Sequence, residues 1–445
     1  MLMPETVPAG IVARIYGNLG RLIGGKAAAG VIGLVYMIVA ARSLGPADYG
    51  VLVLVHAFAI TVGGIIEFPG WHAVVRYGAR ALAREDKPGL AKLLRFVGSV
   101  EVVGGLLAVL VAAILAPILG PGLGWSATAL TFAVPYSFAV LASVRSTAAG
   151  YLQLAGRFDL LGRHNVVAPL VRLIGALFAA LSGLGLKAFL IAWLIAALAE
   201  WLVMWLLAIH VARQQLRGTS LRGGLRGVLA ENPGIWRFMI AANADITLSE
   251  LAGRITPLVV GWMLGPGAVG LYAVAQRATV VIAQPAQILG QAAYAELARL
   301  IAANGHGDRL KRALLHCAGI AALAALPVII VLGLFASDIS VLIGGKAFGE
   351  AAGVLVYLTI ARGFSLAGPP ASATLVALGR PGLSVTANLV VNLGLLPLLP
   401  LLLANFGLAG AGWHAILQSA MASTLLMWFA LRESILPPRH TAGIA

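Results

Sequence analysis

The sequence contains few charged residues for its length and almost no cysteine. Asp, Glu, Lys and Arg make up only 11% of the 445 residues, against about 25% in soluble globular domains. The single cysteine, Cys317, excludes an internal disulfide and a thiolate metal cluster. No glycine-rich phosphate loop of the Walker type is present, which argues against direct ATP hydrolysis. These absences exclude an ordinary soluble protein, a disulfide-stapled domain and a pump driven by its own nucleotide site.

Apolar residues take the place of the missing charge. They account for 60% of the chain, and the mean hydropathy is +0.96. Apolar segments of about 20 residues, the length that crosses a bilayer as a helix, recur from Leu22 to Ile435 with short polar connections. The sequence therefore predicts an all-α polytopic membrane protein with about twelve transmembrane helices. The first two are expected from Leu22 to Ala41 and from Tyr49 to Phe68. Two later ones are expected from Ala351 to Leu375 and from Leu383 to Ala404.

The net charge of +15 comes mostly from Lys and Arg residues that lie between the apolar segments. With the N-terminus inside, the outer connections contain only Arg42, Lys187 and Lys346. Basic residues concentrate on the cytoplasmic side of membrane proteins, so both termini are expected in the cytoplasm. The basic residues form no continuous stripe with interleaved aromatics, which argues against a nucleic-acid partner.

One short motif occurs twice, about half a chain length apart. "RSLGPADYG" begins at Arg42 and "WMLGPGAVG" begins at Trp262. Pro ends a helix and Gly permits a turn, so each copy is expected at the turn between the first two helices of a half. This repeat predicts two parallel six-helix lobes, residues 1–212 and 238–445, joined by a basic cytoplasmic linker over residues 213–237. Two such lobes around a central cavity form an alternating-access architecture.

Longer stretches carry a family resemblance. The segments "GLVYMIVAARSLGPADYGVLVLVHAFAITVGGIIEFPG" and "LIGGKAFGEAAGVLVYLTIARGFSLAGPPASATLVALGRPGLSVTANLVVNLGLLPLL" resemble the polysaccharide-transport branch of the MOP superfamily. Its members include O-antigen, exopolysaccharide and lipid II flippases and, more distantly, multidrug and toxin extrusion (MATE) transporters. The resemblance covers nearly the whole chain.

The resemblance implies a MATE-like fold and a specific transport function. A flippase of this branch moves a polyprenyl-diphosphate-linked oligosaccharide from the cytoplasmic to the periplasmic leaflet, for O-antigen, capsule or exopolysaccharide synthesis. The location would then be the bacterial inner membrane. The expected partners are the lipid-linked oligosaccharide, the bilayer and other polysaccharide assembly proteins. Such a protein is not an enzyme and needs no cofactor.

Polar residues inside the predicted spans are the candidates for substrate contact, because each charge within a membrane helix is costly. The predicted helix from Phe238 to Leu264 carries Asn243, Thr247, Glu250 and Arg254. Their spacings of four, three and four residues put all four side chains on one face of a helix. This face is expected to line the central cavity.

The next predicted helix and one later helix supply further candidates. Arg277, Gln284 and Gln287 share a face of the next helix by the same spacing argument, and Arg362 lies near the middle of its own span. Arg254, Arg277 and Arg362 are expected to bind a diphosphate through charge-assisted, bidentate hydrogen bonds. The corresponding positions of the first half are apolar, so the second half is expected to meet the substrate charge.

Structural interpretations of the same charges stay open at this point. Glu250 and Arg254 have the spacing and order of a favourable helix ion pair, so they could neutralise each other without touching a substrate. Arg172 lies closer to a predicted cytoplasmic end, and its long side chain is expected to extend toward the membrane interface.

Carboxylates within the spans are candidates for ion coupling. Asp245, Glu200 and Glu101 could carry a proton or a cation, because burial makes a carboxylate easier to protonate. They could equally be polar groups that bond between packed helices. The energy source is therefore open between a proton gradient, a sodium gradient and the membrane potential.

Two other functions compete with the flippase. A cation-coupled antiporter of small drugs would share the fold but favour an acidic cavity. A membrane-embedded polysaccharide polymerase or ligase would need convergent acid–base residues in a large outer loop or a catalytic domain. The central arginines argue against the antiporter, and the short outer connections argue against the polymerase or ligase.

Overall fold

A computed structural model describes residues 9–68, 70–219, 223–302 and 307–435, and these residues form helices and no strands. The first part of the chain contains α1 (Ala9–Ile66), α2 (Trp71–Ala83), α3 (Lys87–Leu119), α4 (Ala127–Tyr136), the 3₁₀ helix η1 (Ser137–Ala142), α5 (Ser146–Leu154), α6 (Phe158–His164), α7 (Val167–Ser182), α8 (Gly185–Gln215) and α9 (Val228–Glu231). The second part contains α10 (Ile235–Ala302), α11 (Asp308–Leu334), α12 (Ala336–Gly344), η2 (Lys346–Phe348), α13 (Ala351–Ser365), α14 (Gly368–Ala377), α15 (Pro381–Leu395), α16 (Leu398–Phe406) and α17 (Leu408–Ile435).

The repeated Leu-Gly-Pro motif marks a break inside each of the two longest elements. In α1 the backbone leaves the helical region at Gly45, with φ 70° and ψ 175°. In α10 it does so at Gly265, with φ 82° and ψ 172°. A side chain would be strained at these positive φ values, so the glycines permit the break. The predicted turn is therefore confirmed at both copies of the motif.

The two copies of the motif also pack against each other. A Cβ added to Gly50 would lie 1.7 Å from the carbonyl oxygen of Pro266, and one added to Gly270 would lie 2.2 Å from the carbonyl oxygen of Pro46. The contact is reciprocal, because the last glycine of each copy meets the proline of the other. Each copy of the motif thus supplies the glycine that packs against the proline of the other copy. The motif repeats because this close backbone contact needs a glycine and a proline from both copies, and only glycine permits so close an approach.

The chain forms two compact units. Unit 1 comprises residues 1–44 and 51–247, and unit 2 comprises residues 45–50 and 248–445. The boundary between residues 247 and 248 falls inside α10, beyond the basic segment expected as the linker. The lobe boundaries at residues 212 and 238 stay a prediction.

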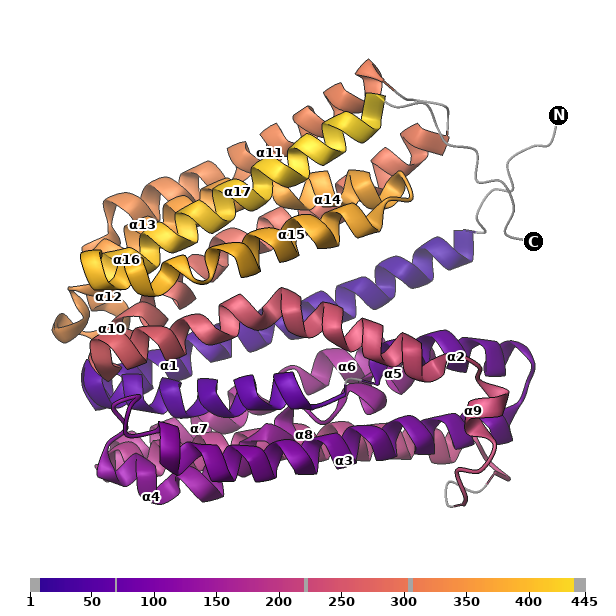
Figure 1. Ribbon diagram of the computed structural model, residues 1–445, viewed down its shortest axis with the longest axis horizontal. Helices are drawn as coiled ribbons and strands as arrows, with labels where there is room; N and C mark the ends of the chain where they lie inside the picture. The colour runs from indigo at the N-terminus through magenta and orange to yellow at the C-terminus, as the bar shows by residue number, and fades with distance from the viewer. Residues whose placement is uncertain (1–8, 69, 220–222, 303–306, 436–445) are drawn as a thin grey trace. The chain divides into compact units, whose positions relative to one another are not determined.

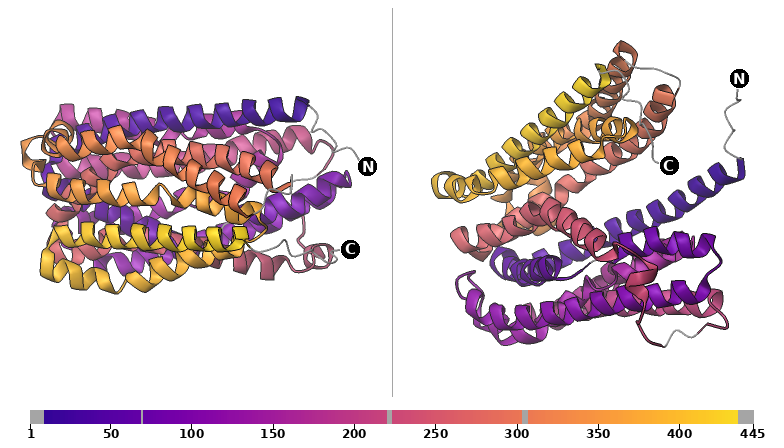
Figure 2. Two further views of the ribbon diagram at one scale, coloured as in Figure 1. Left: turned by 90° about the horizontal axis from the view of Figure 1, so that it is seen from above. Right: turned by 45° about the vertical axis from the view of Figure 1, so that its right-hand side comes forward.

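The core of unit 1 gathers residues from helices far apart in the sequence. Leu90 of α3, Leu152 of α5, Met204 of α8 and Met239 of α10 are almost completely buried in one cluster with residues of α2. In unit 2, α17 is the central helix, and it contacts α11, α13, α14, α15 and α16. The long helices of each unit run side by side in Figure 1, and the orange and yellow helices of unit 2 stay adjacent in both views of Figure 2.

A buried carboxylate joins two helices of unit 1. The side chain of Glu101, on α3, is 0% exposed. It accepts hydrogen bonds from the backbone N–H groups of Ser146, at 2.5 Å, and Thr147, at 2.7 Å. These groups begin α5, where the helix offers no partner of its own. Glu101 therefore forms hydrogen bonds between packed helices, which is the structural role that the sequence left open beside ion coupling.

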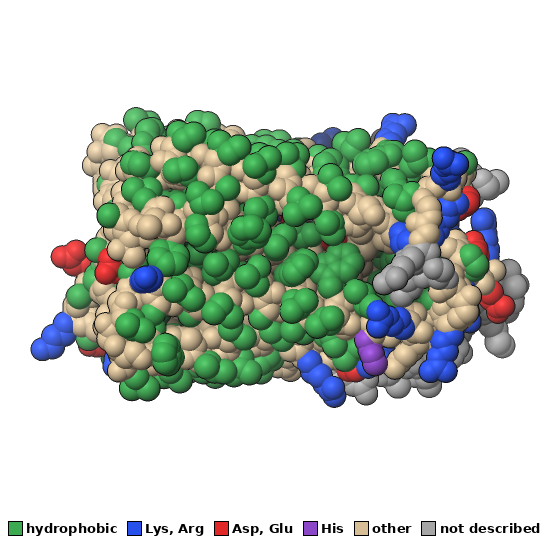
Figure 3. Space-filling model, turned by 90° about the horizontal axis from the view of Figure 1, so that it is seen from below, with side chains coloured by type: hydrophobic (Ala, Val, Ile, Leu, Met, Phe, Trp, Pro, Cys, Tyr) green, Lys and Arg blue, Asp and Glu red, His purple; other side chains and the backbone are tan. Residues whose placement is uncertain are grey.

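Many helices expose apolar side chains as membrane-spanning helices do. Within the described residues, eight segments are long and apolar enough to cross a bilayer, and the bent pair α15–α16 would be a ninth. One of them, residues 24–66, counts once although its 43 residues include the break at Gly45. Figure 3 shows hydrophobic side chains over the middle of one face, with most of the visible Lys and Arg at its right-hand end. The chain is a multi-pass membrane protein, and the expected total of about twelve spans stays a prediction.

Candidate functional site

Unit 2 contains a polar cavity of about 700 Å³. Its walls come from α10, α13, α14, α15 and α17, and α13, α14 and α15 each pack against α17. The volume lies within the roughly 300–1,000 Å³ of small-molecule sites. Three charged residues line it, and its uncharged polar lining is Thr256, Tyr272, Gln276, Thr279, Ser365, Ser372, Asn388, Asn392, His414, Gln418, Ser419 and Ser423. So many polar groups in one membrane helix bundle indicate a hydrated binding site.

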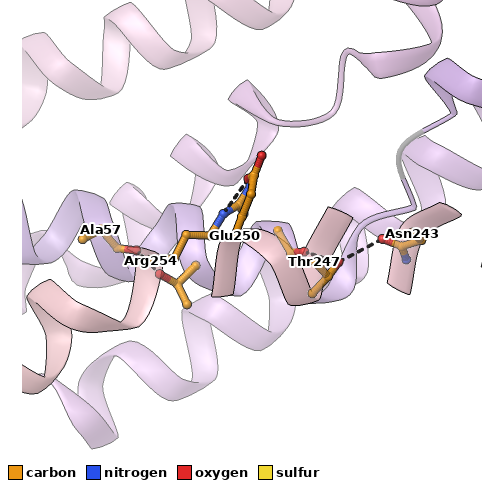
Figure 4. A network of polar contacts seen from close by, with 7 residues as sticks. Ala57, Asn243, Thr247, Glu250 and Arg254 are labelled. Atoms are coloured by element: carbon orange, nitrogen blue, oxygen red, sulfur yellow. Dashed lines mark hydrogen bonds and ion pairs between the residues drawn. The ribbon is translucent and has the colours of Figure 1, made fainter. Parts of the chain in front are cut away.

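Glu250 and Arg254 enter this cavity from α10. The helix is continuous before the break at Gly265, so residues four apart lie on one face. The guanidinium of Arg254 donates two hydrogen bonds to Oε2 of Glu250, as Figure 4 shows. The arginine side chain is 25% exposed and the glutamate side chain 53% exposed. The predicted ion pair is therefore present, and both of its residues line the cavity of unit 2. That the face of α10 lines a central cavity between the lobes stays a prediction.

Arg362 adds a positive charge from α13. It lies close enough to Tyr272 of α10 to interact with its hydroxyl electrostatically. Among the residues whose side chains the structure describes, no carboxylate forms an ion pair with Arg362. Because Glu250 and Arg254 offset each other, Arg362 leaves the described lining with a net positive charge. Such a cavity favours an anionic ligand.

Amides and hydroxyls on α15 and α17 complete the site. Gln418 donates a hydrogen bond to the side-chain oxygen of Asn392 at 2.8 Å. Ser372 and Ser384 share a hydrogen bond of 2.8 Å. These residues were not predicted from the sequence, although Asn388 and Asn392 lie four residues apart in the apolar segment of α15, as His414 and Gln418 do in α17. That i, i+4 spacing in an apolar helix was the signal that could have found them.

The other predicted site residues lie elsewhere. Asn243 belongs to unit 1, where Thr247 donates a hydrogen bond to it at 3.1 Å, as Figure 4 also shows. Arg277 follows Gln276 on α10 but is not among the residues that line the cavity. Gln284 and Gln287 lie in the part of α10 whose side chains fall outside the described structure. The roles of these five predicted residues stay predictions.

Glu200 and Asp245, two of the three carboxylates considered for ion coupling, belong to unit 1. Glu200 of α8 forms an ion pair with Arg145, with 2.8 Å between Oε1 and Nη1, and its carbonyl oxygen is 2.8 Å from Nε2 of His164. Asp245 is among the residues whose side chains the structure does not describe. Ion coupling by either residue stays a prediction.

Unit 1 contains a second polar cluster, centred on Arg172 of α7. The guanidinium lies 4.6 Å from the ring centroid of Trp193 and within hydrogen-bond distance of Nε2 of His56, at 3.0 Å, and of the Tyr36 hydroxyl, at 3.2 Å. Arginine only donates, so Nε2 of His56 accepts and Nδ1 carries the proton toward the Tyr136 hydroxyl at 3.1 Å. Arg172 thus packs into the bundle, and the prediction that it extends to the interface was wrong.

Comparisons with known proteins agree with this architecture. A family described as "Polysaccharide biosynthesis protein" matches residues 39–352. The inner membrane protein YghQ of Escherichia coli (strain K12) is 28% identical over 274 residues, which are 61% of this chain and 76% of YghQ. The solved structure of an inward-facing multidrug resistance MATE family transporter of the MOP superfamily aligns with a TM-score of 0.66 at 16% identity, over 92% of this chain and 94% of that chain.

A flippase structure aligns equally well. The lipid II flippase MurJ, in an inward closed conformation, aligns with a TM-score of 0.64 at 14% identity, over 90% of this chain and 85% of that chain. Identities this low show a shared fold and leave the substrate open. The family match covers more than half of the chain and shows its membership. This multi-pass membrane protein has a MATE-like fold and belongs to the polysaccharide biosynthesis protein family.

Proposed function

We propose that this protein is a flippase that moves a polyprenyl-diphosphate-linked oligosaccharide from the cytoplasmic to the periplasmic leaflet of the bacterial inner membrane. The observation that carries the proposal is the net positive, polar cavity of unit 2, lined by Arg254 and Arg362. Membership of the polysaccharide biosynthesis family supports the substrate class. The relative YghQ, which is an inner membrane protein, supports the proposed location. The basic connections support cytoplasmic termini.

The chemistry of the cavity matches the two ends of the proposed headgroup. A diphosphate offers several anionic oxygens, and the planar guanidinium of Arg362 can bind two of them at once. The sugar hydroxyls need both donors and acceptors, which Asn388, Asn392, Gln418 and the serines supply. No bond is made or broken in such a transfer, so the protein acts as a transporter and not as an enzyme.

A small-molecule antiporter is the second candidate, because a MATE family transporter shares the fold. An organic cation would meet the positive charge of Arg362 unfavourably, since only the already paired Glu250 offers a carboxylate in the described lining. The flippase is therefore the better match. A proton gradient, a sodium gradient or the membrane potential would drive either transport.

The direct test is translocation in proteoliposomes. A fluorescent polyprenyl-diphosphate oligosaccharide is placed in the inner and outer leaflets, and a membrane-impermeant quencher reports the leaflet. We expect the purified protein to speed exchange between leaflets well above protein-free vesicles, and to leave a polyprenol without diphosphate unmoved. Exchange of cationic dyes for protons without lipid movement would instead support the antiporter.

A further inference from the structure

A second hollow, in unit 1, is mainly apolar and has exposed apolar side chains in its walls. It encloses about 620 Å³ between α3, α5 and α8. The ring of Trp205 forms one wall and reaches the backbone of Gly98, where an added Cβ would lie 3.3 Å from the ring. Val103 and Ile209 line the hollow and are 66% and 37% exposed. An apolar groove whose own walls are exposed on a membrane helix bundle is open to lipid chains.

One end of this groove is closed by a basic site. The guanidinium of Arg95 lines the apolar groove and also a neighbouring polar hollow of about 520 Å³. That polar hollow contains Lys92 and Arg226 as well. The groove and the polar hollow meet at Arg95, so an apolar chain and a charged group can be bound side by side.

The acidic residues of the polar hollow are already engaged. Glu231 pairs with Lys92 at 2.6 Å. Asp86 accepts a hydrogen bond from the backbone N–H of Gly89 at 2.8 Å, at the start of α3. The described lining of the hollow has three basic residues, Lys92, Arg95 and Arg226, against the two acidic residues Asp86 and Glu231, so its net charge is positive. This charge suits a phosphate ester.

We infer that this groove is a binding site for an anionic glycerophospholipid of the membrane. One acyl chain would lie against Trp205, Val103 and Ile209, and the phosphate would lie against Arg95 and Arg226. Basic pockets between transmembrane helices bind anionic lipid headgroups in this way. Every residue of the site belongs to unit 1, so the site is separate from the cavity of unit 2 and does not depend on the proposed flippase activity.

Tryptophan fluorescence can report occupancy, because Trp205 lies in the groove wall. The full chain is reconstituted in phosphatidylcholine vesicles that contain increasing fractions of a brominated phosphatidylglycerol, whose bromines quench nearby tryptophans. The difference between the unmodified protein and Trp205→Phe isolates the signal of Trp205. We expect this signal to fall at a lower mole fraction of brominated phosphatidylglycerol than of brominated phosphatidylcholine.

Charge variants then locate the headgroup. Arg95→Gln and Arg226→Gln should each raise the mole fraction for half-quenching of Trp205 about fivefold, the usual effect of one basic residue at a membrane surface. Arg163→Gln, which removes an exposed charge from α6 outside both hollows, should change it little. The inference fails if both brominated lipids quench the Trp205 signal equally, a result that does not depend on the charge variants. It also fails if polyprenyl diphosphate displaces the phospholipid at far lower mole fractions, because the groove would then be an entry site for that lipid.

Discussion

Replacing Arg362 with alanine should weaken transport of the diphosphate lipid by about tenfold to a hundredfold, the cost of one or two hydrogen bonds to a charged group. Arg362 brings the net positive charge to the cavity of unit 2. Arg362→Lys should transport the lipid at a rate between those of the unmodified protein and Arg362→Ala, because lysine keeps the charge but lacks the planar guanidinium. The rate of leaflet exchange at low substrate concentration, in the proteoliposome assay, gives the comparison.

Two controls make this prediction specific. Arg432→Ala, near the end of α17 and outside the cavity, should transport at nearly the normal rate. Arg254→Ala leaves Glu250 in the cavity without its partner, so it should lose more activity than the double variant Glu250→Ala, Arg254→Ala. A folded Arg362→Ala protein with undiminished exchange would remove the basis for diphosphate binding at this cavity.

Alanine at either Gly50 or Gly270 should destabilise the protein by about 3 kcal/mol or more, the upper range for overpacking. The added Cβ would overlap a backbone carbonyl oxygen, at 1.7 Å for Gly50 and 2.2 Å for Gly270, and a backbone atom cannot move aside as the end of a side chain can. Thermal unfolding of the purified protein in detergent measures the loss.

Gly267 provides the matched control, three residues from Gly270 in the same motif. A Cβ there meets nothing within 4 Å, so Gly267→Ala should be neutral or slightly stabilising, since glycine is costly within a helix. Equal melting temperatures for Gly267→Ala and Gly270→Ala would show that the reciprocal contact between the two motif copies does not hold the fold together.

Composition and spacing were enough to predict the class of fold. Long apolar segments predicted membrane helices, and the repeated motif predicted the breaks at Gly45 and Gly265. The spacing on α10 predicted a Glu250–Arg254 pair, which forms. These features are local: each depends on residues within a few turns of one helix.

Features that depend on distant residues were not predictable in this way. The residues of α15 and α17 that line the cavity come into contact only when both helices pack against each other. The direction of the Arg172 side chain depends on Trp193 and His56, which lie on other helical segments. A single sequence does not reveal such pairs.

Prolines changed the expected course of two helices. The segment from Leu383 to Ala404 was expected as one helix, but α15 and α16 meet at a bend of 47° where Pro397 precedes α16. The segment from Ala351 to Leu375 is likewise divided between α13 and α14 before Pro369. Proline has no N–H for the helix ladder, which explains why the breaks lie at these residues.

Photo-crosslinking is the measurement that tests the central claim most directly, because it reports where the substrate lies. A photoreactive amino acid replaces Ala422, which lines the cavity of unit 2, or its neighbour Met421, which is 49% exposed and lies outside the lining. The two positions share α17 but face different sides. Light should join the polyprenyl-diphosphate oligosaccharide to position 422 and not to position 421, and excess unlabelled diphosphate lipid should suppress the product. Equal labelling at both positions, or none at 422, would contradict a diphosphate-lipid site in this cavity.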